Sequence, residues 1–214
     1  MSVRVFASCD SNYFHEHAAA WYYSAFRAGY TPIIEVVNPD EKVKNYVERR
    51  KMANVHYITV ENPSKAFLCS NRFHSAHKYI TDAGLLITDI DCYFQAMPAP
   101  YVEDVGLFFR PENPDHMKIA AGIVWYSGSP VSLEFAKSVS EHIHQLPDQW
   151  FVDQIALLLS YVKFKDEATF FPFTQLQMDW EFQEGTYMWT GKGPRKHENK
   201  TYLNKKKEHE EGTE

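Results

Sequence analysis

Short apolar runs alternate with longer segments of helical character between residues 3 and 87, and this alternation constrains the fold more than any other feature of the sequence. The runs are short enough for buried strands, and the segments between them are long enough for helices. The expected strands are 3–7, 32–37, 56–60 and 85–87. The expected helices are 13–28, 41–52 and 72–83. Because a helix between successive strands lets them run parallel, the pattern predicts an α/β fold with a mostly parallel sheet flanked by helices.

The second half of the chain has the same kinds of segment in a less regular order. Further strands are expected at 105–109, 119–126, 169–173 and 186–189. Further helices are expected at 130–144 and 150–162. A chain of 214 residues is long enough for one sizeable core and short for two, so we expect a single domain over residues 1–197. From residue 198 onward the sequence is almost wholly polar, which predicts a flexible tail over 198–214.

Composition excludes some classes of protein and limits the partners. Hydrophobic residues make up 44% of the chain and aromatic residues 15%, which is too much apolar surface for a disordered protein. The formal net charge of −6 argues against a nucleic-acid partner, because such a partner requires a basic surface. An anionic small substrate would therefore need clustered cations or a metal ion at its own site.

The expected compartment follows from weaker features of the sequence. The three cysteines have no C-x-x-C spacing, so neither a zinc site nor a disulfide framework is indicated. The chain enters an apolar run at Val3 without a charged-then-hydrophobic leader, and no apolar stretch approaches the ~18 residues of a membrane span. We therefore expect a cytoplasmic protein without a transmembrane segment.

The strongest chemical signal is a pair of aspartates directly after the strand expected at 85–87. Alternate side chains of an extended segment share one face, so Asp89 and Asp91 would point the same way while Ile90 packs on the opposite side. Open α/β sheets bind ligands at the carboxyl ends of their strands. Two adjacent carboxylates repel each other unless a cation lies between them or one is protonated, and hard oxygen ligands suit Mg²⁺ or Mn²⁺. The alternative interpretation is two solvated aspartates in a turn.

Three other segments could contact a ligand, although each also has an ordinary structural interpretation. Residues 8–13 join the first strand to a helix, where free backbone N–H groups and the Tyr13 ring could bind a nucleotide, or a short polar side chain could cap the helix. Residues 191–196 combine two glycines with three cations, which could neutralise a diphosphate or form a solvated basic turn. Asp153 and Gln154 begin an apolar helix and could be a capping pair.

Taken together, these features resemble the family 8 glycosyltransferases, which are retaining enzymes that use sugar nucleotides and have the GT-A fold. The family's A-x-D-x-N-Y segment after the first strand is similar to residues 8–13, and its D-Q motif resembles residues 153–154. The family arginine seventeen positions before the first aspartate of the D-x-D corresponds to Arg72, and the F-N-A-G-V-like strand resembles residues 119–124. The features occur in the family's order over residues 3–196.

The resemblance implies a set of site residues. The metal ligands would be Asp89 and Asp91. The catalytic residues, facing the reacting carbon of the donor, would be Asp153 and Gln154. The donor-binding residues would be Ala7, Ser8, Asp10, Asn12, Tyr13, Arg72, Asp89, Ile90, Asp91, Gly122, Gly191 and Lys192. The chain departs from the family at Ala120, where an asparagine is usual, and at Met188 or Thr190, where the family has a histidine as third metal ligand.

These residues predict a glycosyltransferase that moves a sugar from a nucleoside diphosphate sugar, uridine-based by the resemblance, to an unidentified glycan, lipid or protein acceptor. Mn²⁺ or Mg²⁺ would stabilise the leaving diphosphate, and the anomeric configuration would be retained. Two alternatives remain open. One is a protein of the same fold that binds a nucleotide or glycan without turnover, which Ala120 and Met188 favour. The other is a metal-dependent nucleotidyltransferase, which residues 8–13 disfavour because they contain neither glycine nor a cation.

Overall fold

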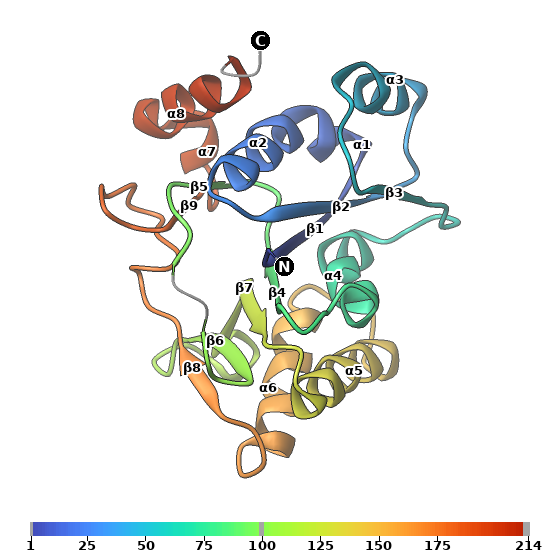
Figure 1. Cartoon of the computed structure of the whole chain (residues 1–214). Coiled ribbons are helices and arrows are strands. Elements are labelled where there is room, and N and C mark those ends of the chain that lie inside the picture. Colours follow the sequence, from blue (N-terminus) through green and yellow to red (C-terminus); the bar gives the residue numbers. More distant parts are fainter. Residues whose placement is uncertain (1, 99–100, 212–214) are drawn as a thin grey trace.

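The computed structural model describes residues 2–98 and 101–211, and its centre is a seven-stranded sheet in the order β3-β2-β1-β4-β7-β6-β8 (Figure 1). The strands are β1 Arg4–Asp10, β2 Thr31–Val37, β3 Val55–Ile58, β4 Leu85–Thr88, β6 Val105–Phe109, β7 Ile119–Tyr126 and β8 Phe170–Pro172. Strand β7 is antiparallel to both of its neighbours, and all the other neighbouring strands are parallel. The prediction of a mostly parallel α/β sheet is confirmed.

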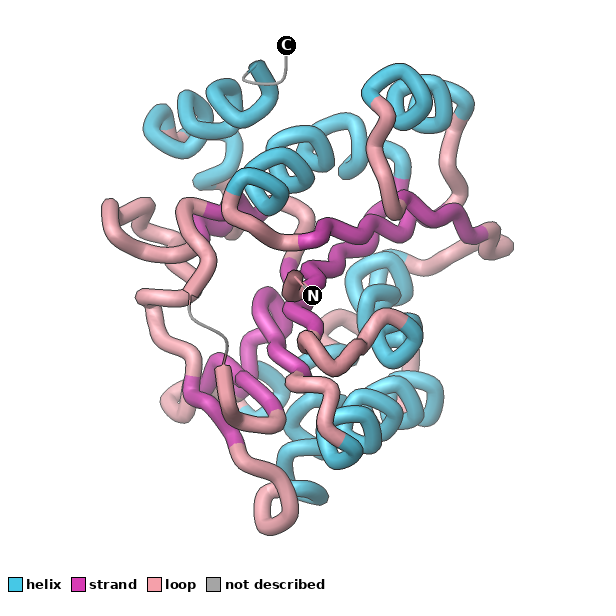
Figure 2. The backbone as a smooth tube through the Cα atoms, viewed as in Figure 1, coloured by secondary structure: helices cyan, strands magenta, loops and turns pink. Residues whose placement is uncertain are grey.

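Helices cover both faces of the sheet (Figures 1 and 2). They are α1 Ser11–Tyr13, α2 Ala19–Arg27, α3 Glu41–Arg50, α4 Lys65–Ser75, α5 Pro130–Gln145, α6 Val152–Phe164, α7 Arg195–Glu198 and α8 Lys200–Glu211, with a π-helical turn at Phe14–Ala18 between α1 and α2. Alternation along β1 separates two cores: Val5 and Ala7 pack with Trp21 of α2, whereas Phe6 packs with Phe135 of α5. No helix in the described ranges is long and apolar enough to cross a bilayer.

A small second sheet ties the segment after β4 to the C-terminal part of the chain. It consists of β5 Cys92–Phe94 and β9 Met188–Thr190, which pair antiparallel so that Cys92 lies opposite Thr190. The sequence did not indicate β5, and the strand expected at 186–189 begins two residues before β9 and ends one residue before its end. This pairing brings the glycine-rich segment after β9 beside the two aspartates after β4.

The helix expected at 72–83 is wrong in its bounds. Helix α4 begins earlier, because the Ser64 hydroxyl accepts a hydrogen bond of 2.9 Å from the Phe67 amide and so caps it. The helix ends at Ser75, and a 3-10 turn over Ala76–Lys78 follows. Ile80 still packs against the core from outside the helix. The helical spacing of apolar residues therefore continues past the end of α4.

The structure also differs from the flexible tail expected at 198–214, as far as residue 211. Helix α8 lies beside α2 (Figure 1), where Arg27 Nη2 donates to His209 Nδ1 over 2.6 Å. Tyr202 is fully buried, and its ring stacks on Tyr93 with 4.7 Å between centroids. A spacing of seven residues places Tyr202 and His209 on one face of the helix. Two buried side chains therefore anchor a segment whose composition is otherwise polar.

Candidate active site

The carboxyl end of β4 carries the two aspartates expected to bind a metal ion. Thr88, the last residue of the strand, accepts a hydrogen bond of 2.9 Å from Trp21 Nε1, which joins the strand end to α2. Ile90 is 4% exposed and packs into the core. The side chains of Asp89 and Asp91 remain 39% and 13% exposed. Both carboxylates can therefore be reached from outside the core.

A buried arginine joins Asp89 to the first catalytic candidate, Asp153. Arg72 of α4 is 6% exposed, and its Nη2 lies 2.9 Å from Asp89 Oδ1 and 3.3 Å from Asp153 Oδ2. The same nitrogen donates to the Ala121 carbonyl over 3.1 Å. Burial raises the pKa of both carboxyls, and the guanidinium opposes that rise. Three segments far apart in the sequence thus form one compact charged group.

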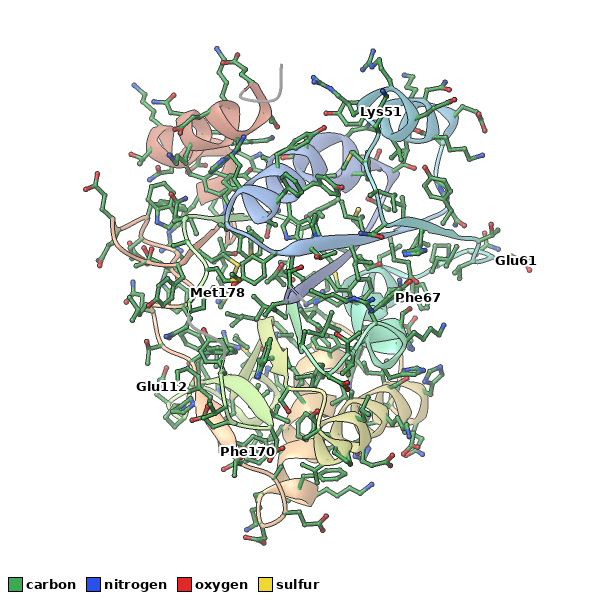
Figure 3. All side chains as sticks on the ribbon, in the orientation of Figure 1. Lys51, Glu61, Phe67, Glu112, Phe170 and Met178 are labelled. Carbon is green, nitrogen blue, oxygen red and sulfur yellow. The ribbon has the colours of Figure 1, made fainter. Side chains whose placement is uncertain are left out.

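The absence of a side chain at Gly122 leaves room for the Asp89 carboxylate. An ideal Cβ on Gly122 would lie 2.9 Å from Asp89 Oδ2 and 3.2 Å from the sulfur of Met178, which Figure 3 labels. The Asp89 amide also donates to the Gly122 carbonyl over 3.3 Å. Any larger residue at position 122 would therefore displace the carboxylate.

Asp91 is paired with a different cation. Lys196 Nζ lies 3.1 Å from Asp91 Oδ2 and donates to the Tyr13 hydroxyl over 3.1 Å. Burial opposes the charged form, but Asp91 and the Tyr13 hydroxyl outweigh it and raise the pKa of Lys196 to about 12. The backbone carbonyl of Asp91 accepts hydrogen bonds from the Tyr202 hydroxyl at 2.8 Å and from the Gly191 amide at 3.0 Å. The turn that holds Asp91 is therefore fixed from two sides.

The second catalytic candidate, Gln154, is held by an arginine that sequence reasoning missed. Arg110 Nη2 donates to Gln154 Oε1 over 2.6 Å. Arg110 follows β6, which runs parallel to β4 because both are antiparallel to β7, so the two strands end at the same edge of the sheet. The arginine is 8% exposed, and its Nε has no hydrogen-bond partner among the described residues. The sequence feature that could have identified Arg110 is a cation directly after a buried apolar strand.

The loop after β1 is only partly open to a ligand. Tyr13 is 43% exposed and Asn12 is exposed, so both can reach a nucleotide. Asp10 Oδ1 accepts a 2.9 Å hydrogen bond from the Tyr13 amide, so this side chain caps α1. The Ser8 hydroxyl is engaged by a buried amide side chain of α4, and Ala7 is fully buried. The last two residues could therefore meet a ligand only through their backbone.

The acidic groups fit a metal ion that is shared with a substrate rather than enclosed by protein. No group of three or more His, Cys, Asp or Glu side chains in the described ranges is arranged to hold a metal. Asp89 and Asp91 each have one oxygen in an ion pair, which leaves the other for a hard cation. Met188 is 2% exposed in the core and is not a ligand for such an ion. Mg²⁺ is commonly held by one or two carboxylates together with substrate phosphates.

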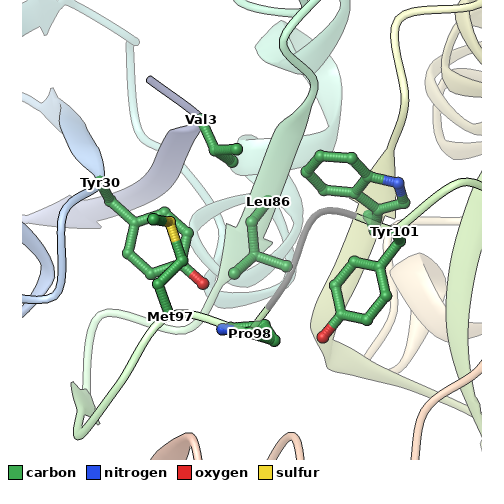
Figure 4. Close-up of a pocket in the computed structure, with 7 residues that line it drawn as sticks. Val3, Tyr30, Leu86, Met97, Pro98 and Tyr101 are labelled. Atoms are coloured by element: carbon green, nitrogen blue, oxygen red, sulfur yellow. The ribbon is translucent and has the colours of Figure 1, made fainter. Parts of the chain in front are cut away.

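A pocket near the start of the strands is of a different kind (Figure 4). Among the residues that the structure describes, its lining includes no predicted site residue and no charged side chain. The lining residues are Val3, Tyr30, Leu86, Met97, Pro98, Tyr101 and Trp125. The chemistry-bearing side chains thus gather at the carboxyl edge of the sheet and not in this apolar pocket.

The fold is that of the GT-A glycosyltransferases. Apo GlyE, a glycosyltransferase in Streptococcus pneumoniae TIGR4, superposes with a TM-score of 0.62 at 12% identity, covering 96% of this chain and 60% of GlyE. LgtC, a galactosyltransferase in complex with donor and acceptor sugar analogs, gives 0.61 at 14% identity, covering 98% of this chain and 95% of LgtC. No protein-family model matches the sequence, and no curated protein matches it either. At such low identity the likeness establishes the fold alone.

Proposed function

We propose that this protein is a metal-assisted glycosyltransferase that uses a nucleoside diphosphate sugar, with uridine as the base. The observation that carries the proposal is the meeting of paired charges at the carboxyl end of β4, Asp89 with Arg72 and Asp91 with Lys196. The carboxylates are ligands that suit Mn²⁺ or Mg²⁺, and the cations offer the charge that a diphosphate requires. The fold shared with GlyE and LgtC, named as a glycosyltransferase and a galactosyltransferase, supports the proposal.

The nucleotide and diphosphate would lie on the Asp91 side of the site. Asp89 and Asp91 would hold the metal ion, which when bound stabilises the negative charge on the leaving diphosphate as a Lewis acid. Lys196 is already beside Asp91, so its ammonium can exchange that carboxylate for a diphosphate oxygen. The exposed Tyr13 ring and Asn12 amide would contact the base and ribose.

The donor sugar would lie on the Asp153 side. Arg72 is anchored by Asp153, which fixes its guanidinium for contact with the sugar or the diphosphate. The Oε1 atom of Gln154 is engaged by Arg110, so the amide is held in one orientation. A neutral amide is not a general base, and a residue of this kind at the reacting carbon agrees with transfer that retains the anomeric configuration. Retention is part of the proposal.

One rival has a specific observation in its favour. Ala120 is 6% exposed and Met188 is 2% exposed, and both pack into the apolar core. Neither side chain contributes a polar contact to a donor, which favours a protein that binds a nucleotide or glycan without turning it over. An assay of Mn²⁺-dependent hydrolysis of uridine diphosphate sugars distinguishes the two, because only the transferase is expected to release uridine diphosphate.

Titration with uridine diphosphate, with and without Mn²⁺, tests the proposed metal site. Asp91→Asn removes one ligand charge, so the gain in affinity that Mn²⁺ produces should fall by about tenfold or more. Lys196→Gln should weaken binding in both conditions and preserve the ratio between them. Asp166→Asn, exposed in the turn after α6, is the matched control and should behave as wild type. An Asp91→Asn protein with the wild-type Mn²⁺ gain would refute the metal site.

The identity of the base and the stereochemistry have their own measurements. Uridine diphosphate should outcompete guanosine and adenosine diphosphates for the wild-type protein, and equal binding would remove the uridine assignment. NMR of the first-formed product should show the donor's anomeric configuration. An inverted product would reject retention and would make Asp153 the candidate base.

A further inference from the structure

Two cations, Arg110 beside Gln154 and Lys192 over the Trp180 ring, lack the carboxylate partners that Arg72 and Lys196 have. No ion pair among the described residues involves Arg110 or Lys192, whereas Arg72 and Lys196 each contact an aspartate. The acidic residue with an influence on Arg110 is Glu112, which is exposed in the following turn and labelled in Figure 3. The pair therefore carries positive charge that no side chain in the described part of the chain neutralises directly.

The two cations lie with an aromatic ring along the carboxyl end of β6. Lys192 Nζ is 5.2 Å from the centroid of the Trp180 ring, and that ring packs against Phe108 with 5.6 Å between centroids. Phe108 lies on β6, two residues before Arg110, which directly follows the strand. Burial lowers the pKa of Lys192, the Arg110 charge lowers it further, and Asp89 opposes the change. The two cations therefore lie close enough to repel each other.

This arrangement is costly unless an anionic group completes it. Arg110 is 8% exposed with its Nε unpartnered among the described residues, and a buried charge without a charged partner destabilises the folded state. The diphosphate of a donor already has Lys196 and Arg72 near the aspartates. Arg110 instead contacts Gln154, on the side assigned to the reacting carbon, where the acceptor must approach. The flat face of Trp180 beside it is a surface on which a sugar ring can pack.

We propose that Arg110, Lys192 and Trp180 form an acceptor subsite for a sugar that carries a carboxylate or phosphate group. The inference rests on the proposed glycosyl transfer and adds the chemical class of the acceptor. The Arg110 guanidinium would bind the anionic group, and the exposed Lys192 side chain would contribute a second charge. The Trp180 ring would contact the sugar face.

Pairs of sugars that differ in charge test the subsite. The wild-type protein, with uridine diphosphate and Mn²⁺ bound, is titrated with methyl glucuronide against methyl glucoside and with glucose 6-phosphate against glucose. At least one anionic sugar should bind more tightly than its neutral counterpart by a factor of about ten or more. Lys192→Gln and Arg110→Gln should abolish that preference, and the loss of affinity for the anionic sugar should exceed any loss of affinity for uridine diphosphate. Lys207→Gln, whose side chain is 71% exposed on α8, is the matched control and should keep the preference.

The outcomes separate the subsite from the proposed function. If uridine diphosphate binds with Mn²⁺ but every anionic sugar binds no better than its neutral counterpart, the subsite is overturned and the transferase stands. If Lys192→Gln weakens uridine diphosphate and spares the anionic sugar, the cation serves the donor and the subsite is again overturned. If uridine diphosphate does not bind, the proposed function fails, and the same sugar pairs titrated alone still test the subsite. Lys192 is exposed, so its variant provides the test even where Arg110→Gln does not fold.

Discussion

Replacing Arg72 with methionine tests whether paired charges hold the centre of the site. The Arg72 side chain is buried, and its Nη2 lies within 3.3 Å of carboxylate oxygens of Asp89 and Asp153. Methionine keeps an apolar stem of similar length, so the main loss is the charge. Removing one partner of a buried pair costs about 3–5 kcal/mol, because the other charge stays buried. Water can still solvate Asp89, which is 39% exposed, so we expect a loss near the lower limit, about 3 kcal/mol.

Two further variants test whether the loss in free energy of unfolding comes from a buried carboxylate that has lost its partner. Asp153 is 7% exposed, and Asp153→Asn in the Arg72→Met background removes the charge that has lost its partner. The double variant should therefore be more stable than Arg72→Met by about 1–2 kcal/mol. Arg49→Met, on the exposed side of α3, makes the same substitution without a buried partner. That control should change the free energy of unfolding by less than about 0.5 kcal/mol.

Urea denaturation followed by circular dichroism and by tryptophan fluorescence provides the measurement. The free energy of unfolding is extrapolated linearly to zero denaturant, and coincident transitions from the two probes justify a two-state treatment. The reasoning would be refuted by an Arg72→Met protein within about 1 kcal/mol of wild type. It would also be refuted by a double variant no more stable than Arg72→Met, because the stranded carboxylate would then not be the cause.

Three other predictions concern the surroundings of the site. Gly122→Ala should weaken Mn²⁺-dependent binding of uridine diphosphate in a titration, because its Cβ would lie 2.9 Å from Asp89 Oδ2, and wild-type affinity would show that the carboxylate can move away freely. Tyr202→Ala should lower the free energy of unfolding by about 3 kcal/mol or more in urea, whereas a flexible tail would leave it unchanged. Three histidines should make the free energy of unfolding fall as pH falls. Burial lowers the pKa of His17 to about 3 and the pKa values of His74 and His209 to about 4. Because these values lie below the ordinary value of 6.5, only the unfolded chain takes up the protons as pH falls from about 7.5 to 5.5, and the free energy of unfolding in urea should drop by about 4 kcal/mol. His209→Gln should remove about a third of that drop.

Local patterning predicts the strands of this chain well where burial is continuous. The strands expected at 105–109 and 119–126 have the bounds of β6 and β7. Both strands lie in a sheet that is covered on two faces, so almost every position is buried and apolar. The length of the apolar run therefore gives the bounds of the strand. The helix expected at 72–83 is wrong in its bounds because Ile80 is partly buried by tertiary contact outside α4, and burial alone does not distinguish a helix from a packed turn.

The parts of the site that sequence reasoning missed depend on contacts between distant segments. Arg110 meets Gln154 across 44 positions, and the sequence before β7 gives no sign of which strand end lies beside α6. Pairing of β5 with β9 is of the same kind, since Cys92 and Thr190 are brought together only by the completed fold. Sequence periodicity records how one element faces the core, and it does not record which elements share an edge.

The charge at the site is less negative than the charge of the chain. The sequence carries −6 overall, which would oppose the binding of any anionic donor. The candidate site residues include four carboxylates and four cations, so their charges sum to 4 − 4 = 0 before a metal ion binds. The carboxylates are Asp10, Asp89, Asp91 and Asp153, and the cations are Arg72, Arg110, Lys192 and Lys196. Because salt screens exposed charges beyond about 8 Å, the acidic surface acts weakly on a bound ligand while these contacts act at full strength. The four cations come from α4, the end of β6 and the segment after β9, so only the folded chain can overcome its own net charge.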